Sequence, residues 1–454
     1  MHPQIRQEGP SFRHRVDLEI VSIMSIPPSY PLLSGRHLTH AGWNMSGPVV
    51  SITWTPGWLP NRAVTTSSRR EFIVERLGVI AARAYRDAWG DLAARALEPN
   101  VFLDPDFALS AAQHLDPDRR VSFLFVWSSK AKGYRDLLGV CAVAERWSAL
   151  GLLASVWLPN LSSLGFPMLD RDRAGPALQE LLLWVRAGLG GAPGLLFRSM
   201  PVEGPTTAIL KVVAAELNLA LEIIEAWKRA ALRGSGRVGL TALSPKNGKE
   251  LRRQRRRMSA EGKVTYATAR EGIAFRQAVE EFLALEAAGW KGAAGTALLS
   301  RPERSAFTRT MTRNLADRGL CRVDSLLLDG VPVAMGLLLR AGRTDALWKI
   351  AYREDMARFS PGVQFVLDLS EVQCRSADVD ITDSCAVPNH QMINRIWPDR
   401  ISLVDVAIAL RPGRHTNYLT AVAAERLARR LRATAKRTLQ AWRAWQRANA
   451  GRVA

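Results

Sequence analysis

The sequence predicts an α/β fold of two tandem domains, each a mixed, mostly antiparallel sheet flanked by helices, followed by a basic C-terminal helix. The same order of elements occurs twice: two helices, three strands, then helix, strand, helix and strand. The dipeptide Asp329-Gly330 between two apolar runs is typical of a hairpin turn, which makes the strands around it antiparallel. At 454 residues the chain is also too long for one core.

In the first half, a helical pattern begins at Glu71 and runs to Leu97, and a second helix extends from Pro105 to about His114. Three runs rich in Val, Phe and Trp then predict strands. The predicted elements that follow are strands at 121–127, 137–144 and 152–158, a helix at 174–189, a strand at 195–200, a helix at 206–217 and a strand at 220–227.

The second half repeats this order after a basic helix. Its predicted elements are helices at 245–261, 273–288 and 302–318, strands at 264–269, 321–328, 331–339 and 345–352, a helix at 362–375, a strand at 379–383, a short helix at 391–396, a strand at 401–409 and a long helix at 418–448. The predicted boundaries are a poorly ordered extension at 1–70, domains at 71–236 and 237–410, and the basic helix at 411–454.

Composition points to a folded protein of the cytoplasm. Hydrophobic residues make up 47% and charged residues 23% of the chain. We expect no membrane span and no secretory signal, because no apolar run is long enough and the first residues have no apolar core. The four cysteines are scattered, which predicts neither a metal site nor a disulfide framework.

The net charge of +20 is concentrated in two short segments. Residues 411–454 contain eleven Lys or Arg and one acid, Glu425, and five arginines lie between Arg252 and Arg257. This distribution argues against one broad nucleic-acid-binding face, so we expect no nucleic-acid partner. It leaves contact with phosphates or anionic lipid open.

The segment Ser360-Pro361-Gly362 joins a predicted strand to a predicted helix. Ser can cap a helix, Pro fits its first turn, and the amides at a helix start favour anions. The sequence therefore indicates a site for a phosphate-bearing cofactor, with an ordinary strand-to-helix connection as the alternative.

Several segments resemble one family. They are Trp89-Gly-Asp-Leu-Ala-Ala-Arg-Ala-Leu-Glu-Pro-Asn-Val-Phe102, Phe282-Leu-Ala-Leu-Glu-Ala-Ala-Gly-Trp-Lys-Gly-Ala-Ala-Gly-Thr296, Arg358-Phe-Ser-Pro-Gly-Val363, Asp383-Ser-Cys and His390-Gln-Met-Ile-Asn-Arg-Ile-Trp-Pro-Asp-Arg400. With the element order, they resemble the CelD-like GNAT acetyltransferases, a family associated with cellulose biosynthesis and distantly related to the FemAB aminoacyltransferases. The resemblance covers residues 71 to 410.

The resemblance implies acetyl-CoA or another acyl-CoA as co-substrate, with no metal. In the GNAT fold the fourth and fifth strands splay apart and the pantetheine arm pairs with the exposed backbone. Carried onto this chain, the splayed strands are 345–352 and 379–383. The phosphate cradle consists of Arg358, Ser360, Pro361, Gly362 and Val363. The chain has one glycine where GNAT enzymes have two, and Arg358 can add a charge-assisted contact.

Three residues are candidates for proton transfer. Asp383, at the end of the predicted fifth strand, can take the proton of an amine acceptor, or it caps the helix near Asn389. His390 is a second candidate base, or a histidine that bonds to the backbone at a helix start. Tyr352 can protonate the leaving thiolate, or it only packs at the end of its strand.

Trp290 and Lys291 follow the first helix of the second domain, where the GNAT layout implies part of the acceptor site. Lys291 can hold an acidic acceptor or a phosphate, and the neighbouring glycines suggest a flexible loop. The alternative is a turn with an exposed lysine and a packed tryptophan.

The two basic segments have alternatives of their own. The arginines at 252–257 lie on a predicted helix as a solvated face, or they contact RNA. The C-terminal helix has apolar residues at spacings of three and four, opposite a basic face. We expect it to dock on the protein or a partner, with attachment to the inner membrane surface as the alternative.

Taken with the resemblance, the sequence predicts an acyltransferase that moves an acetyl or acyl group from acyl-CoA to an amine or hydroxyl, on a small molecule or in an envelope polysaccharide pathway. The second domain carries the chemistry, and the first is structural or binds the acceptor. One alternative is a non-catalytic scaffold of a polysaccharide machine. Another is a FemAB-like transferase that uses aminoacyl-tRNA.

Overall fold

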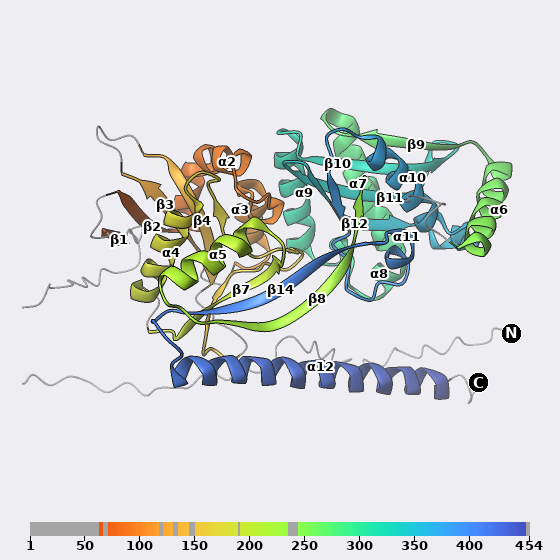
Figure 1. Ribbon diagram of the computed structural model, residues 1–454. Helices are drawn as coiled ribbons and strands as arrows, with labels where there is room; N and C mark the ends of the chain where they lie inside the picture. Colours follow the sequence, from red (N-terminus) through yellow and green to blue (C-terminus); the bar gives the residue numbers. More distant parts are fainter. Residues whose placement is uncertain are drawn as a thin grey trace, which may run out of the picture. The chain divides into compact units, whose positions relative to one another are not determined.

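Figure 1 presents the computed structural model of the chain, which describes residues 63–66, 71–117, 121–129, 135–144, 150–188, 191–234 and 244–450. All of these residues belong to one compact unit, residues 58–454. Apart from Ala63–Thr66, which form strand β1, the predicted N-terminal extension lies outside the described residues. So do residues 235–243, where the two predicted domains meet.

The first half follows the predicted order, with strands added before and within it. Its elements are β1 (Ala63–Thr66), β2 (Phe72–Gly78), α1 (Val79–Ala82), η1 (Arg83–Tyr85), α2 (Arg86–Ala94), η2 (Val101–Leu103), α3 (Pro105–His114), β3 (Val121–Ser128), β4 (Leu137–Ala144), β5 (Ala154–Val156), β6 (Met168–Leu169), α4 (Ala174–Gly188), β7 (Gly194–Pro201), α5 (Pro205–Glu216) and β8 (Leu221–Arg233).

The second half also keeps the predicted order. Its elements are α6 (Pro245–Glu261), β9 (Val264–Ala269), α7 (Gly272–Ala288), α8 (Trp290–Ala293), η4 (Leu298–Ser300), α9 (Pro302–Ala316), β10 (Cys321–Leu328), β11 (Val331–Ala341), β12 (Thr344–Tyr352), η5 (Glu354–Phe359), α10 (Pro361–Arg375), β13 (Ile381–Asp383), α11 (Ile393–Ile396), β14 (Asp399–Ala409) and α12 (Thr416–Ala450). Asp329 and Gly330 both have positive φ, as the predicted hairpin turn between β10 and β11 requires.

The helix predicted to begin at Glu71 is wrong over its first turns, because Phe72–Gly78 form β2. Phe72 and Val74 are buried, and β2 pairs antiparallel with β3 along its whole length. Glu75, also buried, accepts a hydrogen bond of 3.1 Å from the indole Nε1 of Trp127 on β3. The partner strand, which lies about fifty residues away in the sequence, decides the conformation of this segment.

Within the described residues, fourteen strands form one sheet, with the order β1-β2-β3-β4-β5-β7-β14-β8-β13-β12-β11-β10-β9 and β6 paired beside β4. Two of the pairings, β5 with β7 and β12 with β13, are parallel, and the others are antiparallel. Helices flank the sheet in both halves (Figure 1). The predicted fold class, mixed α/β with two GNAT-like halves and a basic C-terminal helix, is confirmed.

The two halves exchange their last strands. Starting from either outer edge of the sheet, the strands of one half come first. The last strand of the other half follows, and only then comes the last strand of the first-named half. Thus β14 lies between β7 and β8, and β8 lies between β14 and β13. The pair β8–β14 is antiparallel at the centre of the sheet, so each half completes the sheet of the other.

The first part of α12 packs against β8 and β14. The hydroxyl of Tyr418 donates to the carbonyl of Ala407 at 2.8 Å, and Arg429 forms an ion pair of 3.0 Å with Glu225. Four large apolar side chains point away from this contact. Each residue turns the helix by about 100°, which places the four within an arc of about 60° on the side opposite Tyr418 and Arg429. They are Leu427, Leu431, Trp442 and Trp445, each more than half exposed.

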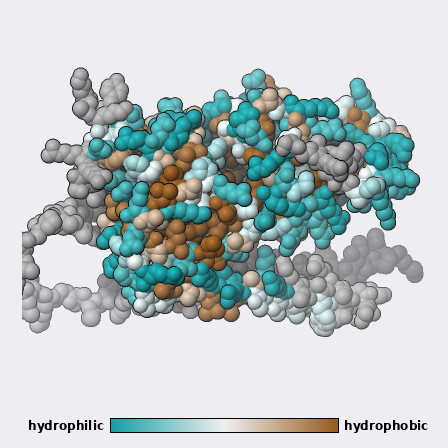
Figure 2. Space-filling view, in the orientation of Figure 1, coloured by the Kyte–Doolittle hydropathy of each residue, from teal (hydrophilic) through white to brown (hydrophobic). Residues whose placement is uncertain are grey.

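The predicted docking of α12 therefore occurs through its first turns, while the aromatic residues remain exposed on the described part of the chain. Within the described residues, no helix combines the length and the apolar character needed to cross a bilayer. Figure 2 also shows apolar side chains gathered where α4 and α5 lie. Leu183 and Val212 are among the exposed ones there.

Candidate functional site

Strands β12 and β13 pair at one end only and then separate, as the resemblance to GNAT enzymes implies. They pair only over three residues each, from Thr344 to Ala346 and from Ile381 to Asp383. From Leu347 to Tyr352, β12 keeps its pairing with β11 but has no partner strand on its other side among the described residues. We call these six residues the free edge of β12.

One carbonyl of the free edge is already bonded to a side chain. The amide of Arg353 donates to the carbonyl of Val333 on β11 at 2.9 Å, so the backbone groups of Arg353 face β11. Backbone groups alternate in direction along a strand, so those of Ile350, three residues earlier, face the other side. There the ammonium of Lys291 donates to the carbonyl of Ile350 at 3.0 Å. Lys291, predicted to bind the acceptor, thus lies at the place where an added strand would pair.

Lys291 is held in this position by Glu286, at the end of α7. Its ammonium lies 2.7 Å from Oε1 of Glu286, whose side chain is 3% exposed. The second oxygen of Glu286 accepts from the amide of Leu298 at 2.8 Å. Glu286 is therefore fully engaged, and its burial makes the partnership with Lys291 costly to break.

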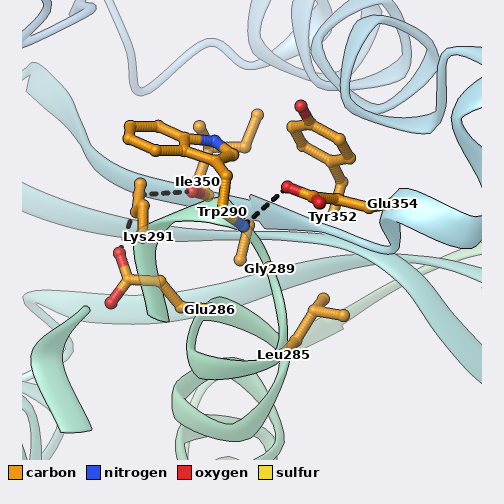
Figure 3. A pocket seen from close by; sticks show the side chains of 9 residues that line it. Leu285, Glu286, Gly289, Trp290, Lys291, Ile350, Tyr352 and Glu354 are labelled. Atoms are coloured by element: carbon orange, nitrogen blue, oxygen red, sulfur yellow. Dashed lines mark hydrogen bonds and ion pairs between the residues drawn. The ribbon is translucent and has the colours of Figure 1, made fainter. Parts of the chain in front are cut away.

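Trp290 and Tyr352 lie on either side of a small hollow above Ile350 (Figure 3). The indole of Trp290 is 56% exposed, and its amide donates to Glu354 at 2.6 Å. Residues 290–293 form the short helix α8 and not the predicted flexible loop. A side chain at Gly292 would collide with the carbonyl of Ala287, which explains why glycine stands there. The hollow has a volume of about 20 Å³, room for about one water molecule.

Lys349 is a functional candidate that the sequence reasoning missed. It lies on the free edge, half-buried, with its ammonium 5.5 Å from the ring centre of Trp348. Among the described residues the ammonium makes no hydrogen bond or ion pair. Burial, followed by the charge of Lys291, lowers its pKa. A lysine inside an otherwise apolar strand is the signal that points to it.

His390, a predicted base, lies within electrostatic reach of Lys291. Burial, together with the Lys291 charge, lowers the pKa of its imidazole. Its Nδ1 lies 3.4 Å from the amide of Ile393, the helix-start contact that was the alternative interpretation. If Nδ1 accepts that hydrogen bond, the neutral ring carries its proton on Nε2.

Asp383, the other predicted base, forms a buried ion pair with Arg229 of β8. Both side chains are 5% exposed. The remaining oxygen of Asp383 accepts from the amide of Cys385 at 2.9 Å, and Arg229 donates to the carbonyl of Ser163 at 3.1 Å. The pair thus joins the strand end of one half to a strand and a loop of the other.

The first half also closes the site from the side of Trp348. The indole Nε1 of Trp348 donates to the carbonyl of Leu161 at 2.6 Å. The ring packs edge-on against Phe107 of α3 and Phe307 of α9. Leu161 has a φ of 73°, a conformation that is uncommon for a branched residue and places its carbonyl within reach of the indole. The loop after β5 therefore forms a wall of the splayed region.

The predicted cradle is built differently from expectation. Ser360 does not cap α10 with its side chain, because it adopts a left-handed conformation with φ of 53°. Its carbonyl instead accepts from the amides of Val363 and Gln364 at 2.9 and 3.0 Å. Pro361 has no amide hydrogen, so the amide of Gly362 is the free one in this turn among the described residues.

The side chains around the cradle are also engaged. A Cβ on Gly362 would lie 3.0 Å from the ring of Tyr352, so the tyrosine ring covers the start of α10. Arg358 forms an ion pair of 2.7 Å with Glu261 and lies over the ring of Phe359, 4.6 Å from its centre. Arg358 therefore already has a carboxylate partner where the sequence predicts a phosphate.

These residues match acyl-CoA in part. The free edge suits the pantetheine arm, and the Gly362 amide and the Ser360 hydroxyl suit one phosphate oxygen each. A pyrophosphate needs more donors and more positive charge than this turn supplies. The residues therefore fit the arm, while most of the charge for the phosphates must come from outside residues 358–363. Among the described residues, no group of three His, Cys, Asp or Glu is placed to hold a metal ion.

Comparisons with known proteins agree with the fold. A family model described as an acetyltransferase (GNAT) domain matches residues 245–377. No curated protein matches the chain. Three solved structures illustrate the likeness, all at TM-scores below 0.5, and they carry no evidence on what this chain binds.

The first is FemX, with a TM-score of 0.47 and 10% identity, covering 71% of this chain and 95% of that one. The second is a conserved protein of unknown function from Bacteroides thetaiotaomicron, with a TM-score of 0.45 and 11% identity, covering 72% and 97%. The third is a GCN5-related N-acetyltransferase from Kribbella flavida, with a TM-score of 0.29 and 12% identity, covering 75% and 72%. Residues 245–377, from the start of α6 to just past the end of α10, are the part of the chain that is similar to a GNAT acetyltransferase domain.

Proposed function

We propose that this protein is an acyltransferase that moves an acetyl or acyl group from acyl-CoA to an amine or hydroxyl acceptor at the free edge of β12. The observation that carries the proposal is the splay between β12, which lies within the residues that match the GNAT domain, and β13, which follows shortly after them. A strand edge with unpaired backbone groups, in a sheet otherwise paired, is a place for an extended ligand to add.

In this proposal Lys291 yields the carbonyl of Ile350 to the incoming arm. Its side chain is 22% exposed, and its ammonium can release this carbonyl while it keeps its ion pair with Glu286. Trp290 and Tyr352 then border the acyl group, and the Tyr352 hydroxyl is the candidate proton donor to the leaving thiolate.

Proton removal from the acceptor has three candidate groups in the proposal. The pKa of Lys349 is lowered and its ammonium has no hydrogen-bond or ion-pair partner among the described residues, so it gives up its proton more readily than an ordinary lysine. Asp383 and His390 remain predictions for this role. The acceptor nitrogen or oxygen attacks the thioester carbon, the carbon–sulfur bond breaks, and the acceptor's proton passes to the base.

The finer parts of the proposal rest on the sequence resemblance. These are the CelD-like family and a link to envelope polysaccharide synthesis. A cytoplasmic location is included because the four cysteines, none of them in a disulfide, suit a reducing compartment. The exposed stripe of α12 is proposed to contact an anionic membrane surface, since Glu425 is the last acid before the end of the helix.

One observation favours a second candidate, a non-catalytic scaffold. The chain's own side chains occupy both halves of the donor site, Lys291 at Ile350 and Tyr352 over Gly362. In a scaffold these contacts would be permanent.

Calorimetry of the full chain with acetyl-CoA separates the two candidates. An acyltransferase is expected to bind acetyl-CoA, and Gly362→Glu is expected to abolish binding by bulk and like charge. Ser360→Ala, which removes one hydroxyl contact, is expected to weaken binding several-fold and keeps the fold as a control. No heat and no thermal shift with millimolar acetyl-CoA or longer acyl-CoA would contradict the proposal.

A further inference from the structure

A groove lies between α6 and α10, next to the predicted cradle. It has a volume of about 350 Å³, within the usual range for small-molecule sites, whereas the hollow at Trp290 is far smaller. Basic residues of α6 line one wall and residues of α10 line the other. The groove is therefore large enough for a nucleotide-sized group.

The groove has an excess of unpaired positive charge. Its two carboxylates have arginine partners: Asp368 lies 3.0 Å from Arg255, and Glu371 lies 3.5 Å from Arg375. Three cations from α6 make no ion pair or hydrogen bond among the described residues, and they are Lys249, Arg252 and Arg256. Unpaired cations converging on a hollow favour an anionic ligand with several oxygens.

The groove also holds a buried donor without a partner. Nη1 of Arg255 is shielded from solvent and makes no hydrogen bond, although Nη2 of the same guanidinium bonds to Asp368. A buried unsatisfied donor costs about 1–3 kcal/mol, so a missing acceptor is the physical expectation. Arg255 lines the groove, so a phosphate that enters it supplies this acceptor once the guanidinium turns toward the ligand.

The groove lies close to the cradle along α10. Gln364, which lines it, is two residues beyond Gly362, and its side-chain amide donates to the carbonyl of Leu251 on α6 at 3.0 Å. Arg358 joins the cradle to α6 through Glu261. A ligand whose pyrophosphate lies at Gly362 therefore has the groove two residues further along α10.

We propose that the α6–α10 groove binds the adenosine 3′-phosphate end of acyl-CoA, and that the arginines of α6 supply the positive charge that the cradle lacks. This inference rests on the proposed function, because it assigns the other end of the same donor. The basic helix α6, which precedes β9, then has a role in donor binding. Its positive charge compensates for a cradle that has only one free amide.

A nucleotide fits this groove better than a nucleic-acid chain. The groove is compact and its basic residues all lie on one helix, α6, so it offers no long basic track for a continuous phosphate backbone. No aromatic side chain lines it, so it offers no stacking platform for successive bases.

The test compares Arg252→Glu/Arg256→Glu with Arg257→Glu in the full chain. Arg257 is on the same exposed helix but does not line the groove, so the control carries a charge change of the same kind outside the site. Calorimetry is performed with three probes: CoA, 3′-dephospho-CoA and adenosine 3′,5′-bisphosphate. Thermal unfolding checks that each variant is folded.

The expected result is a loss of CoA affinity of about tenfold or more in the double variant and little change in Arg257→Glu, since each lost charge-assisted contact is worth about a factor of ten. The double variant should lose less affinity for 3′-dephospho-CoA than for CoA, and wild type should bind adenosine 3′,5′-bisphosphate. Equal CoA affinity in the double variant and wild type would overturn this inference and leave the proposed function intact.

Two further outcomes are decisive. Absence of CoA binding to wild type would overturn the proposed function and this inference together. RNA binding that is lost in the double variant while CoA binding is unchanged would assign the groove to a nucleic acid and overturn the inference.

Discussion

The ammonium of Lys291 lies 3.0 Å from the carbonyl oxygen of Ile350, so a side chain from α8 occupies a backbone acceptor on the free edge of β12. The same ammonium is paired with the buried carboxylate of Glu286. Lys291 therefore links the end of α7 to the strand that borders the candidate site, and both bonds must be considered when it is changed.

Lys291→Met is expected to lower the free energy of unfolding by about 1–3 kcal/mol, because Glu286 is left buried without its cation. The double variant with Glu286→Gln should recover part of this loss, because no unpaired charge remains. Urea unfolding of the wild type, both single variants and the double variant measures the coupling. Strictly additive effects would show that the pair contributes nothing.

Asp383→Asn is expected to lower the free energy of unfolding by about 3–5 kcal/mol, since Arg229 is then buried without a counter-charge. Arg229→Met should destabilise to a similar extent, and the two changes should not be additive. If Asp383→Asn unfolds like wild type but is inactive, Asp383 acts in the chemistry and not as a structural ion pair.

His390→Ala is expected to change stability little and to lower turnover.

Lys349→Met is expected to alter the pH dependence of stability. The pKa of Lys349 is lowered in the folded protein, so between that pKa and the ordinary value of about 10.4 the unfolded chain binds more protons. Wild type therefore gains stability as pH rises through this range, and the variant lacks that gain. Urea unfolding from pH 7 to pH 10 measures it, and parallel curves for the two proteins would contradict the lowered pKa.

The exposed stripe of α12 is expected to bind vesicles that contain anionic lipid. Each Lys or Arg near such a surface contributes about 1 kcal/mol, and the attraction falls with salt. Replacing Leu431, Trp442 and Trp445 with serine should abolish flotation at low salt and leave acetyl-CoA binding unchanged. If wild type does not float, and the serine variant instead changes oligomeric state, the stripe contacts a second copy of the chain.

The sequence was sufficient for most elements of the fold. Helices such as α3 and α10 begin at Pro105 and Pro361, and the turn at Asp329-Gly330 has the backbone that its residues favour. The apolar runs at 321–328 and 331–339 predicted β10 and β11, because such runs can be recognised without knowing a distant partner. These features are encoded within a few residues.

The remaining features depend on partners distant in sequence. Phe72–Gly78 became a strand because β3 lies beside it, and Ser360 lost its expected cap because the preceding η5 places it in a left-handed conformation. Asp383 was predicted from its strand end, but its partner Arg229 lies 154 residues away. Local pattern cannot identify such a partner, and it could not reveal the exchange of β8 and β14.

That exchange has a consequence for how the chain is made. During synthesis β7 and β8 emerge early, but β14, which pairs with both of them, emerges about 170 residues after β8. The first half therefore leaves the ribosome with unsatisfied strand edges, which are prone to aggregation. Cutting the chain between the halves would take from each half the strand that the other half contributes to its part of the sheet. Neither half is therefore expected to fold as an independent, soluble piece. Assembly must instead wait for the last strand.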